Sequence, residues 1–273
     1  MRRALGTRAV GHAGTLDPFA TGLLIVLVGK ATRLARFAEQ QTKAYLATAR
    51  LGFATTTDDL TGEAIEGLEA GRGVAERGPP GPQEIEAAIA SFHGTSLQRP
   101  PAYSAKKVDG ERSYARARRG ETVELAPVPI TVYQAELVGY VYPEVQFRMT
   151  VTAGSYIRGI ARDLGERLGT GAHLIALRRE AIGRLTVAEA VALESVSRGD
   201  VRAPLAAVGH LPHLIVSVEE AAALGHGKVV RRTEALAPVD GPVVALSEAE
   251  QLLAIGRIED GMFYPEVVLE AAG

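Results

Sequence analysis

The clearest structural pattern in the chain is the strict alternation of apolar and polar residues across Glu144 to Ala153. Val145, Phe147, Met149 and Val151 alternate with Gln146, Arg148, Thr150 and Thr152. Successive side chains of a strand point to opposite faces, so this pattern predicts a half-buried strand. An apolar stripe at helical spacing follows from Ile157 to Leu168, with Ser155 as the expected N-cap and Gly169 as the end. The fold must therefore contain both a sheet and helices that cover it.

Other segments extend this pattern along the chain. Strands are predicted at Leu23 to Val28, Lys43 to Gly52, Ile130 to Tyr142 and His173 to Leu185, and helices at Ala31 to Gln40, Gln83 to Phe92 and Glu111 to Arg119. His93 to Val108 contains two consecutive prolines and is predicted to be an extended excursion. Because the elements lack the regular strand–helix–strand period of a doubly wound sheet, we predict an α+β fold.

The length and composition favour two domains. The chain has 273 residues, of which 47% are apolar, enough to bury a substantial core. The polar segment 198–204 contains Gly199 and Pro204 and is the best candidate boundary. Beyond it, short apolar runs broken by glycine and proline predict a small β-rich module. We therefore expect a domain over 1–203 and a module over 204–273.

Several classes of protein do not match this composition. There is no apolar run long enough for a transmembrane helix and no signal-peptide pattern, so we expect a cytoplasmic protein. The absence of cysteine excludes disulfides, cysteine nucleophiles and thiolate metal sites. The six histidines lack metal-ligand spacing, and no nucleotide-binding glycine fingerprint occurs. We expect no metal and no cofactor.

Charge is segregated along the chain, although the formal net charge is only −2. Residues 205–273 carry four basic and ten acidic residues, so residues 1–204 have a net charge of +4. Within the latter, Arg99 to Arg119 holds seven basic and two acidic residues, and Ser155 to Arg184 holds six and three. Such runs are often solvated surface, but a basic footprint is also what phosphate binding requires.

The segment from Gly11 to Leu24 places one carboxylate, that of Asp17, among residues that control the backbone. Gly11, Gly14 and Gly22 permit positive φ or close backbone approach, while Pro18 restricts the conformation of Asp17. A carboxylate on a stiff loop next to a core strand is preorganised for chemistry. The alternative, from the Asp-Pro dipeptide alone, is an ordinary turn aspartate.

The whole segment resembles the catalytic motif of the TruB family, the bacterial tRNA pseudouridine-55 synthases. The matching positions are His12, Gly14, Leu16, Asp17, Pro18, Ala20 and Gly22. The resemblance implies a mixed, largely antiparallel sheet flanked by helices, with a small PUA-like module at the end of the chain. It also implies about thirty more residues at the start of family members, so the chain opens inside a motif. An acidic module is a poor match for phosphate contact, so a structural role is an equal alternative.

The resemblance extends to residues that line the expected site. It implies that Arg158, in Tyr156-Ile157-Arg158, pairs with the catalytic Asp17, and that Tyr156 lines the uracil pocket. It further implies that Tyr45 stacks on the target base, that Leu177 forms a pocket wall, and that His12 helps to hold the flipped-out nucleotide. Without the resemblance, Arg158 would be interpreted as a surface arginine and Tyr45 as a cross-strand packing residue. Leu177 would be a core residue and His12 a structural histidine.

A basic insertion over residues 94–120 lies between the Tyr45 and Arg158 motifs. Lysine and arginine alternate there with Tyr103 and Tyr114, which suits phosphate contact and stacking on unpaired bases. The candidate RNA-binding residues are Lys106, Lys107, Arg112, Arg116, Arg118 and Arg119. The resemblance implies that this insertion clamps the T stem-loop of tRNA and that the protein acts as a monomer.

The implied reaction is the isomerisation of the T-loop uridine to pseudouridine, with Asp17 as nucleophile and the target base flipped out of its stack. Whether the carboxylate attacks the base or the sugar is left open by the sequence. Two alternatives are a non-catalytic RNA-binding or RNA-folding protein on the same scaffold and a hydrolase that leaves an abasic site. A buried ion pair between Asp17 and Arg158 would argue against the binding protein, because recognition alone does not require its desolvation cost.

Overall fold

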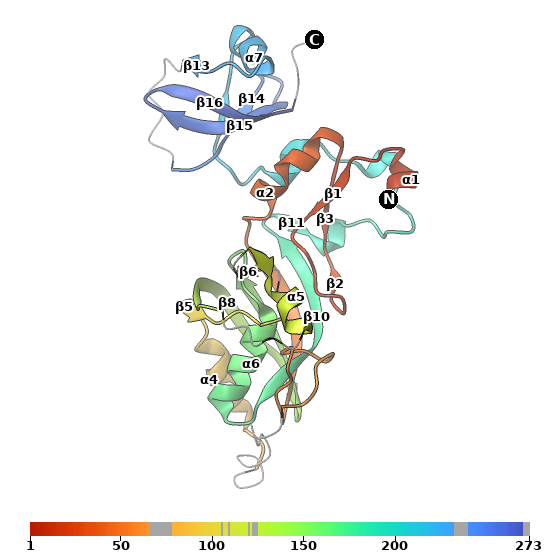
Figure 1. Cartoon of the computed structure of the whole chain (residues 1–273), viewed down its shortest axis with the longest axis vertical. Coiled ribbons are helices and arrows are strands. Elements are labelled where there is room, and N and C mark those ends of the chain that lie inside the picture. The colour runs from red at the N-terminus through yellow and green to blue at the C-terminus, as the bar shows by residue number, and fades with distance from the viewer. Residues whose placement is uncertain are drawn as a thin grey trace. The chain divides into compact units, whose positions relative to one another are not determined.

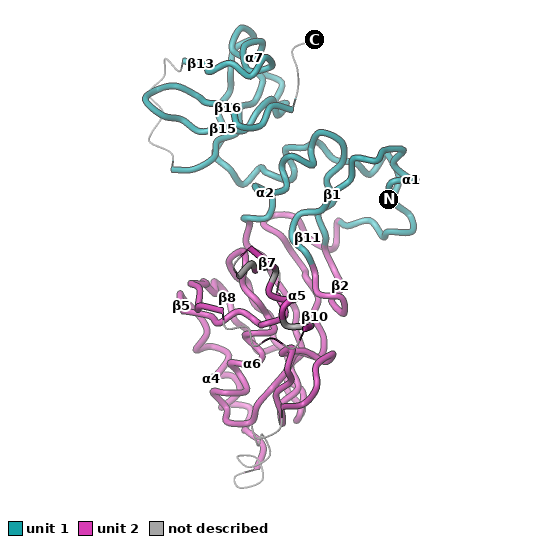
Figure 2. The backbone as a smooth tube through the Cα atoms, in the orientation of Figure 1, with its two compact units in different colours: residues 1–15, 24–40, 190–273 teal, residues 16–23, 41–189 magenta. Residues whose placement is uncertain are grey.

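The computed structural model describes residues 1–65, 78–104, 106–108, 110–119, 121, 125–231 and 240–269. It divides into two compact units, coloured separately in Figure 2. Unit 1 comprises residues 1–15, 24–40 and 190–273, and unit 2 comprises residues 16–23 and 41–189. Sheets dominate both units and helices accompany them, which confirms the predicted α+β class (Figure 1).

Unit 2 is built on a seven-stranded sheet with the order β11-β10-β4-β9-β8-β5, to which β2 is added beside β10. The strands are β2 (Thr21–Gly22), β4 (Lys43–Leu51), β5 (Gly94–Gln98), β8 (Val128–Val141), β9 (Glu144–Val151), β10 (Ala172–Ile182) and β11 (Leu185–Thr186). All neighbours are antiparallel except β2 and β10, which are parallel. The predicted mixed, largely antiparallel sheet is therefore confirmed.

One face of this sheet is covered by helices. In β4 and β9 every second side chain is buried, as the alternation predicted. Helices α4 (Pro82–Ala90) and α6 (Ile157–Leu168) pack on the sheet and on each other (Figure 1). Their apolar residues, among them Ile85, Ile160 and Leu164, join the strands in one hydrophobic core. This core provides the rigid support on which the candidate site is built.

Helix α6 begins one residue later than the capping prediction required. Its N-cap is Tyr156, in an extended conformation, with no side-chain capping hydrogen bond. The Ser155 hydroxyl instead lies 3.2 Å from the Thr152 hydroxyl, so the predicted Ser155 cap is wrong. At the other end Gly169 adopts φ +64°, the left-handed conformation expected of a C-terminal glycine.

The loop that carries Asp17 is fastened to β10 through β2. Thr21 pairs with Arg178 and Gly22 with Arg179, and the Leu23 amide donates to the Arg179 carbonyl at 2.9 Å. Gly22 has φ +98°, and a Cβ there would lie 2.3 Å from the Arg179 carbonyl oxygen. Glycine is therefore required at this position. Gly14 also has a positive φ, whereas a Cβ on Gly11 would make only ordinary contacts, so the prediction for Gly11 is wrong.

The basic insertion contains more regular structure than an extended excursion. Its first five residues form β5, the edge strand paired with β8, so the chain leaves the sheet only at Arg99. We call residues 99–104 the insertion root. Beyond it, β6 (Lys107–Val108) and β7 (Glu111–Arg112) form a short hairpin that leads into α5 (Ser113–Arg118). The short helix predicted in this region is confirmed.

Unit 1 begins with helix α1 (Arg2–Leu5) and a two-stranded antiparallel sheet of β1 (Val10–Ala13) and β3 (Ile25–Val28). A 3-10 helix, η1 (Gly29–Leu34), continues into α2 (Ala35–Ala38), where one longer helix was predicted. Short 3-10 helices η2 (Val187–Glu189) in unit 2, and η3 (Arg198–Asp200) and η4 (Pro204–Ala207) in unit 1, complete the connecting segments.

The last part of unit 1 is the small β-rich module that the sequence predicted. Its sheet has the order β12-β14-β15-β16-β13, and α7 (Val218–Gly225) packs against it. The strands are β12 (His213–Ile215), β13 (Val230–Arg231), β14 (Val243–Leu246), β15 (Leu252–Glu259) and β16 (Met262–Val268). Val243 to Leu246 and Val267 to Leu269, two of the predicted apolar runs, lie in or next to these strands.

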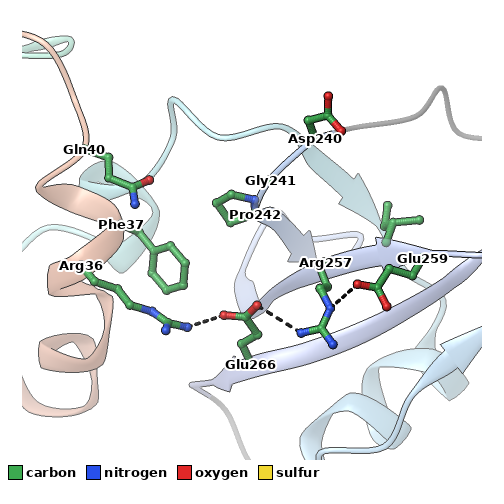
Figure 3. A pocket seen from close by; sticks show the side chains of 10 residues that line it. Arg36, Phe37, Gln40, Asp240, Gly241, Pro242, Arg257, Glu259 and Glu266 are labelled. Carbon is green, nitrogen blue, oxygen red and sulfur yellow. Dashed lines mark hydrogen bonds and ion pairs between the residues drawn. The ribbon is translucent and has the colours of Figure 1, made fainter. Parts of the chain in front are cut away.

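A polar pocket in unit 1 lies where α2 meets β15 and β16 (Figure 3). Arg36 pairs with Glu266, and Arg257 lies 3.6 Å from Glu266 and 2.6 Å from Glu259. Arg33 adds a 2.7 Å hydrogen bond to the Val268 carbonyl. These groups are largely exposed, so each pair contributes little to stability. The pocket contains none of the candidate site residues predicted from the sequence.

Candidate active site

Asp17 and Arg158 form a two-point ion pair in unit 2, although 141 positions separate them. Arg158 Nε donates to Asp17 Oδ2 at 3.0 Å and Nη2 donates to Asp17 Oδ1 at 2.9 Å. The planar guanidinium matches both carboxylate oxygens at once, so the pair fixes the orientation of the carboxylate. The contact predicted between these two residues is present.

The remaining donors of Arg158 are also occupied. Nη1 donates to the Thr57 carbonyl and Nη2 to the Tyr103 carbonyl, each at 3.0 Å. Nη1 further lies 3.6 Å from Asp59 Oδ2. The Arg158 side chain is 5% exposed, whereas that of Asp17 is 29% exposed. A buried cation thus holds a carboxylate that stays accessible to a substrate.

Asp59 is itself held firmly, and sequence reasoning missed it. Its Oδ1 accepts hydrogen bonds from the Thr57 hydroxyl, the Thr61 amide and the Thr61 hydroxyl, at 2.6 to 2.9 Å. We call residues 53–65 the acidic loop. The dense run of threonine and aspartate was the available signal, because such residues build local hydrogen-bonded turns.

Tyr45 lies on β4 with its side chain buried, directly across from Arg179 of β10. Burial raises the pKa of the Tyr45 hydroxyl, while the charge and hydrogen bond of Arg179 oppose that rise and nearby Asp17 adds to it. Arg179 is almost fully buried and donates from Nε to the Leu23 carbonyl at 2.8 Å. Arg179, which was not predicted as a site residue, therefore connects Tyr45 to the end of the Asp17 loop.

Tyr156 is positioned by the side chain of Gln98, another residue that was not predicted. Gln98 Nε2 donates to the Tyr156 carbonyl and the Tyr156 amide donates to Gln98 Oε1, both at 2.9 Å. Burial raises the pKa of the Tyr156 hydroxyl, Ser104 and Arg158 lower it, and Asp17 raises it. Both tyrosines thus lie within electrostatic reach of Asp17.

Leu177 and His12 have different settings. Leu177 is buried on β10 opposite Ala47 of β4, and its carbonyl lies 3.5 Å from the Thr21 hydroxyl at the end of the Asp17 loop. His12 is exposed on β1 of unit 1, opposite Val26 of β3. The structure therefore gathers Asp17, Tyr45, Tyr156, Arg158 and Leu177 in unit 2, while His12 belongs to the other unit.

The basic insertion neutralises part of its own charge. Arg119 forms ion pairs with Glu111 and Glu121, and Arg116 forms one with Glu121. These pairs lower the pKa of both glutamates. The side chain of Lys106 is partly exposed. Lys107, Arg112 and Arg118 were also predicted to bind RNA, and their side chains lie outside the described part of the structure.

Within the described ranges, no group of three or more histidine, aspartate or glutamate side chains could hold a metal ion. No helix of the described residues is long and apolar enough to cross a membrane.

The model for the family described as "TruB family pseudouridylate synthase (N terminal domain)" matches residues 2–157. This chain belongs to the TruB family. A second model, the "tRNA pseudouridylate synthase B C-terminal domain", matches residues 158–223. The resemblance drawn from the Asp17, Tyr45 and Arg158 motifs is thereby confirmed.

Relatives with the same family name match over most of their length. The "tRNA pseudouridine synthase B" of Thermobifida fusca is 42% identical over 263 residues, which are 91% of this chain and 87% of that protein. That of an Arthrobacter species is 40% identical over 282 residues, 98% of this chain and 90% of that protein. Both matches support membership of the family over most of the chain.

Solved structures support the fold. An H/ACA ribonucleoprotein bound to a substrate RNA containing 2'-deoxyuridine includes a chain that matches with a TM-score of 0.72 and 22% identity, over 98% of this chain and 78% of that one. The archaeal Nop10-Cbf5 complex gives a TM-score of 0.70 at 22% identity, over 98% and 79%. At this identity the likeness concerns the fold alone, and it agrees with the mixed sheet described above.

Proposed function

We propose that this chain is a tRNA pseudouridine synthase that isomerises the T-loop uridine at position 55, with Asp17 as the catalytic nucleophile. Family membership and relatives named tRNA pseudouridine synthase B support the activity. The observation that carries the residue assignment is the two-point contact between the accessible Asp17 carboxylate and the buried Arg158 guanidinium. A carboxylate held at both oxygens by one guanidinium is fixed in orientation for attack.

The reaction exchanges one bond for another within the substrate. The glycosidic bond from ribose C1' to uracil N1 breaks, the uracil turns, and a bond from C1' to C5 forms. The proton displaced from C5 is lost and N1 gains one, so the isomer has the same atoms and the same oxidation state. No external donor is needed for this exchange. Asp17 acts by attack on the base or on the sugar, and both schemes require an ionised carboxylate.

The side chains around Asp17 supply the binding of the base. The uridine has to leave its stack, which costs a few kcal/mol and favours a loop whose bases are already splayed. We assign Tyr45 to stacking on the flipped uracil, Tyr156 and Leu177 to the pocket walls, and His12 to holding the extruded nucleotide. Their common relation to the Asp17 loop in unit 2, His12 excepted, supports these roles.

The RNA partner and the organisation of the chain follow from the same assignment. We assign the T stem-loop to the basic insertion, with Lys106, Lys107, Arg112, Arg116, Arg118 and Arg119 as phosphate contacts. We propose residues 1–203 as the catalytic domain and 204–273 as a PUA-like module. Because Asp17 and Arg158 come from one chain, a monomer suffices, and the cytoplasm is where such a substrate is met.

Nucleoside analysis of a T stem-loop RNA after incubation with the protein tests the proposal. Pseudouridine is expected from the unaltered chain, and none from D17A or D17N, both with nearly unchanged RNA affinity. The control is D260N, which makes the same substitution in an exposed turn of unit 1. Free uracil with an abasic site would indicate a hydrolase, and bound but unchanged RNA would indicate a binding protein. Appreciable pseudouridine from D17A would remove Asp17 from the mechanism.

A further inference from the structure

Arg162 lies one turn after Arg158 on α6, and the two arginines reach the same two segments of the chain. Arg158 binds the carbonyl of Thr57 in the acidic loop and that of Tyr103 in the insertion root. Arg162 binds the carboxylate of Asp58 in the acidic loop, at 2.9 Å, and the carbonyl of Arg99 in the insertion root, also at 2.9 Å. The helix therefore carries two parallel bridges four residues apart.

We call the contacts of Arg162 with Asp58 and Arg99 the outer bridge. This bridge does not touch Asp17, yet its charged groups are largely buried. The side chains of Arg162 and Asp58 are 18% and 13% exposed. Arg162 is oriented from its own helix, since Nε and Nη2 both donate to Asp163 Oδ1, at 3.0 and 2.7 Å. Room for it comes from Gly159, where a Cβ would lie 3.1 Å from Gln98 Nε2 and 3.5 Å from Arg162 Nη2. A larger residue at 159 would crowd both groups.

The acidic loop end of this bridge is anchored to the main sheet. Asp58 adopts φ +59°, its carbonyl accepts from the Leu174 amide at 3.0 Å, and the Leu60 amide donates to the Leu174 carbonyl at 2.9 Å. The insertion root follows the end of β5, and its Ser104 carbonyl accepts from the Tyr114 amide of α5 at 3.1 Å. Arg162 thus ties a segment that has left the sheet to one that is bonded to β10.

We propose that Arg162 is a positioning residue. It holds the insertion root against the acidic loop, so that Arg158 keeps its two hydrogen bonds to Asp17 when the insertion binds RNA. The proposal rests on the proposed function. A guanidinium is suited to the task because its separate N–H groups bind a carboxylate and a carbonyl in fixed directions, which an ammonium does not reproduce. Loss of the outer bridge loosens the Tyr103 carbonyl and with it one partner of Arg158.

The test compares R162Q, R162K, D58N and the double variant R162Q/D58N on a T stem-loop RNA. We expect R162Q to lower kcat about tenfold and to raise KM several-fold, and R162K to recover only part of this loss. The double variant should be no worse than R162Q, because the effects of two residues in one bridge are not additive. The control is R167Q on the same helix, where Arg167 donates to the Ser91 hydroxyl and lies over the Phe92 ring. R167Q should keep kcat and KM within about twofold, the range of an uncoupled surface change.

Hydrogen exchange on the full-length protein gives a readout that does not depend on activity. R162Q should speed exchange at residues 56–60 and 99–104 and leave α4 and β9 unchanged. Unaltered exchange in those segments, kinetics within twofold of the parent chain, or additive losses in the double variant would each overturn the proposal. If the parent chain makes no pseudouridine, the proposed function fails, while the exchange comparison still decides whether the bridge exists.

Discussion

The Arg158 guanidinium is held in one orientation by contacts from several parts of the chain. Its guanidinium meets Asp17 at two points, the Thr57 and Tyr103 carbonyls at one each, and Asp59 at longer range. The desolvation of a buried cation is costly, and the fold offsets that cost by occupying its donors. The residue also lies in the first turn of α6, where the helix dipole disfavours a cation. Its position is explained by Asp17 rather than by the stability of the helix.

The first prediction concerns Arg158→Lys. Lysine keeps the charge but cannot satisfy both oxygens of Asp17 and two carbonyls, so at least two charge-assisted hydrogen bonds are lost. At about 1.5–3 kcal/mol for each such bond, kcat should fall by a factor of about 100 or more. Single-turnover assays on T stem-loop RNA measure the loss. Near-normal turnover would remove Arg158 from contact with the reacting group.

The second prediction concerns pH and Asp58. Burial raises the pKa of this carboxyl to about 6, although Arg162 and Arg158 oppose the rise and Asp163 adds to it. Between about pH 4 and pH 6 the folded protein keeps a proton that the unfolded chain has lost, so this group's contribution to stability falls as pH rises. The neutral side chain of D58N does not lose this contribution. The Tm of D58N minus that of the parent should therefore rise as pH increases across this window, and the corresponding change in the free energy of unfolding is at most about 3 kcal/mol.

A control for the second prediction is D200N. Hydrogen bonds from Ser197 lower the pKa of Asp200, so its contribution has the opposite sign and is lost as pH falls. The Tm difference between D200N and the parent should move the other way across the acidic range, or stay flat because Asp200 is exposed. A D58N difference that is independent of pH would show that Asp58 does not titrate as described.

The sequence led to the contact between Asp17 and Arg158, but only through a family resemblance. Spacing alone favoured a turn aspartate and a surface arginine, because a separation of 141 positions leaves no local signal of contact. Gln98, Asp59, Arg162 and Arg179 were not predicted as site residues. Each acts by touching backbone or side chains from another part of the chain, and such partners are fixed by the tertiary fold rather than by any local pattern.

At the scale of elements, strong periodicity predicted strands and helices correctly, whereas rules for single residues predicted the ends of elements less well. The alternation in β9 and the apolar stripe of α6 were both found, because burial of one face against a common core enforces them. The Ser155 cap was wrong, since the α6 N-terminus is held by the pairing of Gln98 with Tyr156 instead. Strand β5 was predicted only as an extended segment, because its sequence, Gly-Thr-Ser-Leu-Gln, shows little apolar alternation.

The third prediction concerns Gly22→Ala at the junction of β2 and β10. The substitution combines a φ of +98° with a Cβ 2.3 Å from a backbone oxygen, so β2 must shift and the Asp17 loop with it. Strain of this kind costs about 1–3 kcal/mol or more, seen as a lower midpoint in urea, and kcat should fall with it. The control is G139A on β8, where an added Cβ meets nothing within 4 Å. Equal stability of the two variants would contradict this account.

At the scale of the whole molecule, the sign of the charge differs between parts of the chain. The net charge of −2 hides a basic portion over residues 1–204 and an acidic one over 205–273. An average taken over the chain would discourage any search for an RNA partner. Glu111 in the basic insertion and Glu121 just after it neutralise part of the charge of Arg116 and Arg119, so Lys106 is the better candidate for phosphate contact.

The fourth prediction concerns the salt dependence of RNA binding. Affinity for a T stem-loop should fall linearly with salt on a double-logarithmic plot, because phosphate contacts release counterions. Lys106→Gln should reduce the slope by about 1, the signature of one lost phosphate contact. Arg257→Gln is the control, since Arg257 is paired with Glu259 in the acidic module. A slope that falls only in R257Q would move the contact from the insertion to the module.

Gln98 does for Tyr156 what a neighbouring peptide group does in a sheet: it offers an acceptor and a donor in one plane to an amide and a carbonyl. The match depends on a single atom, the amide nitrogen. Deamidation would replace that nitrogen by oxygen and set a carboxylate against the Tyr156 carbonyl, two acceptors facing each other in a dry place. Such a change would remove one of the two hydrogen bonds by which Gln98 holds the Tyr156 backbone at the start of α6.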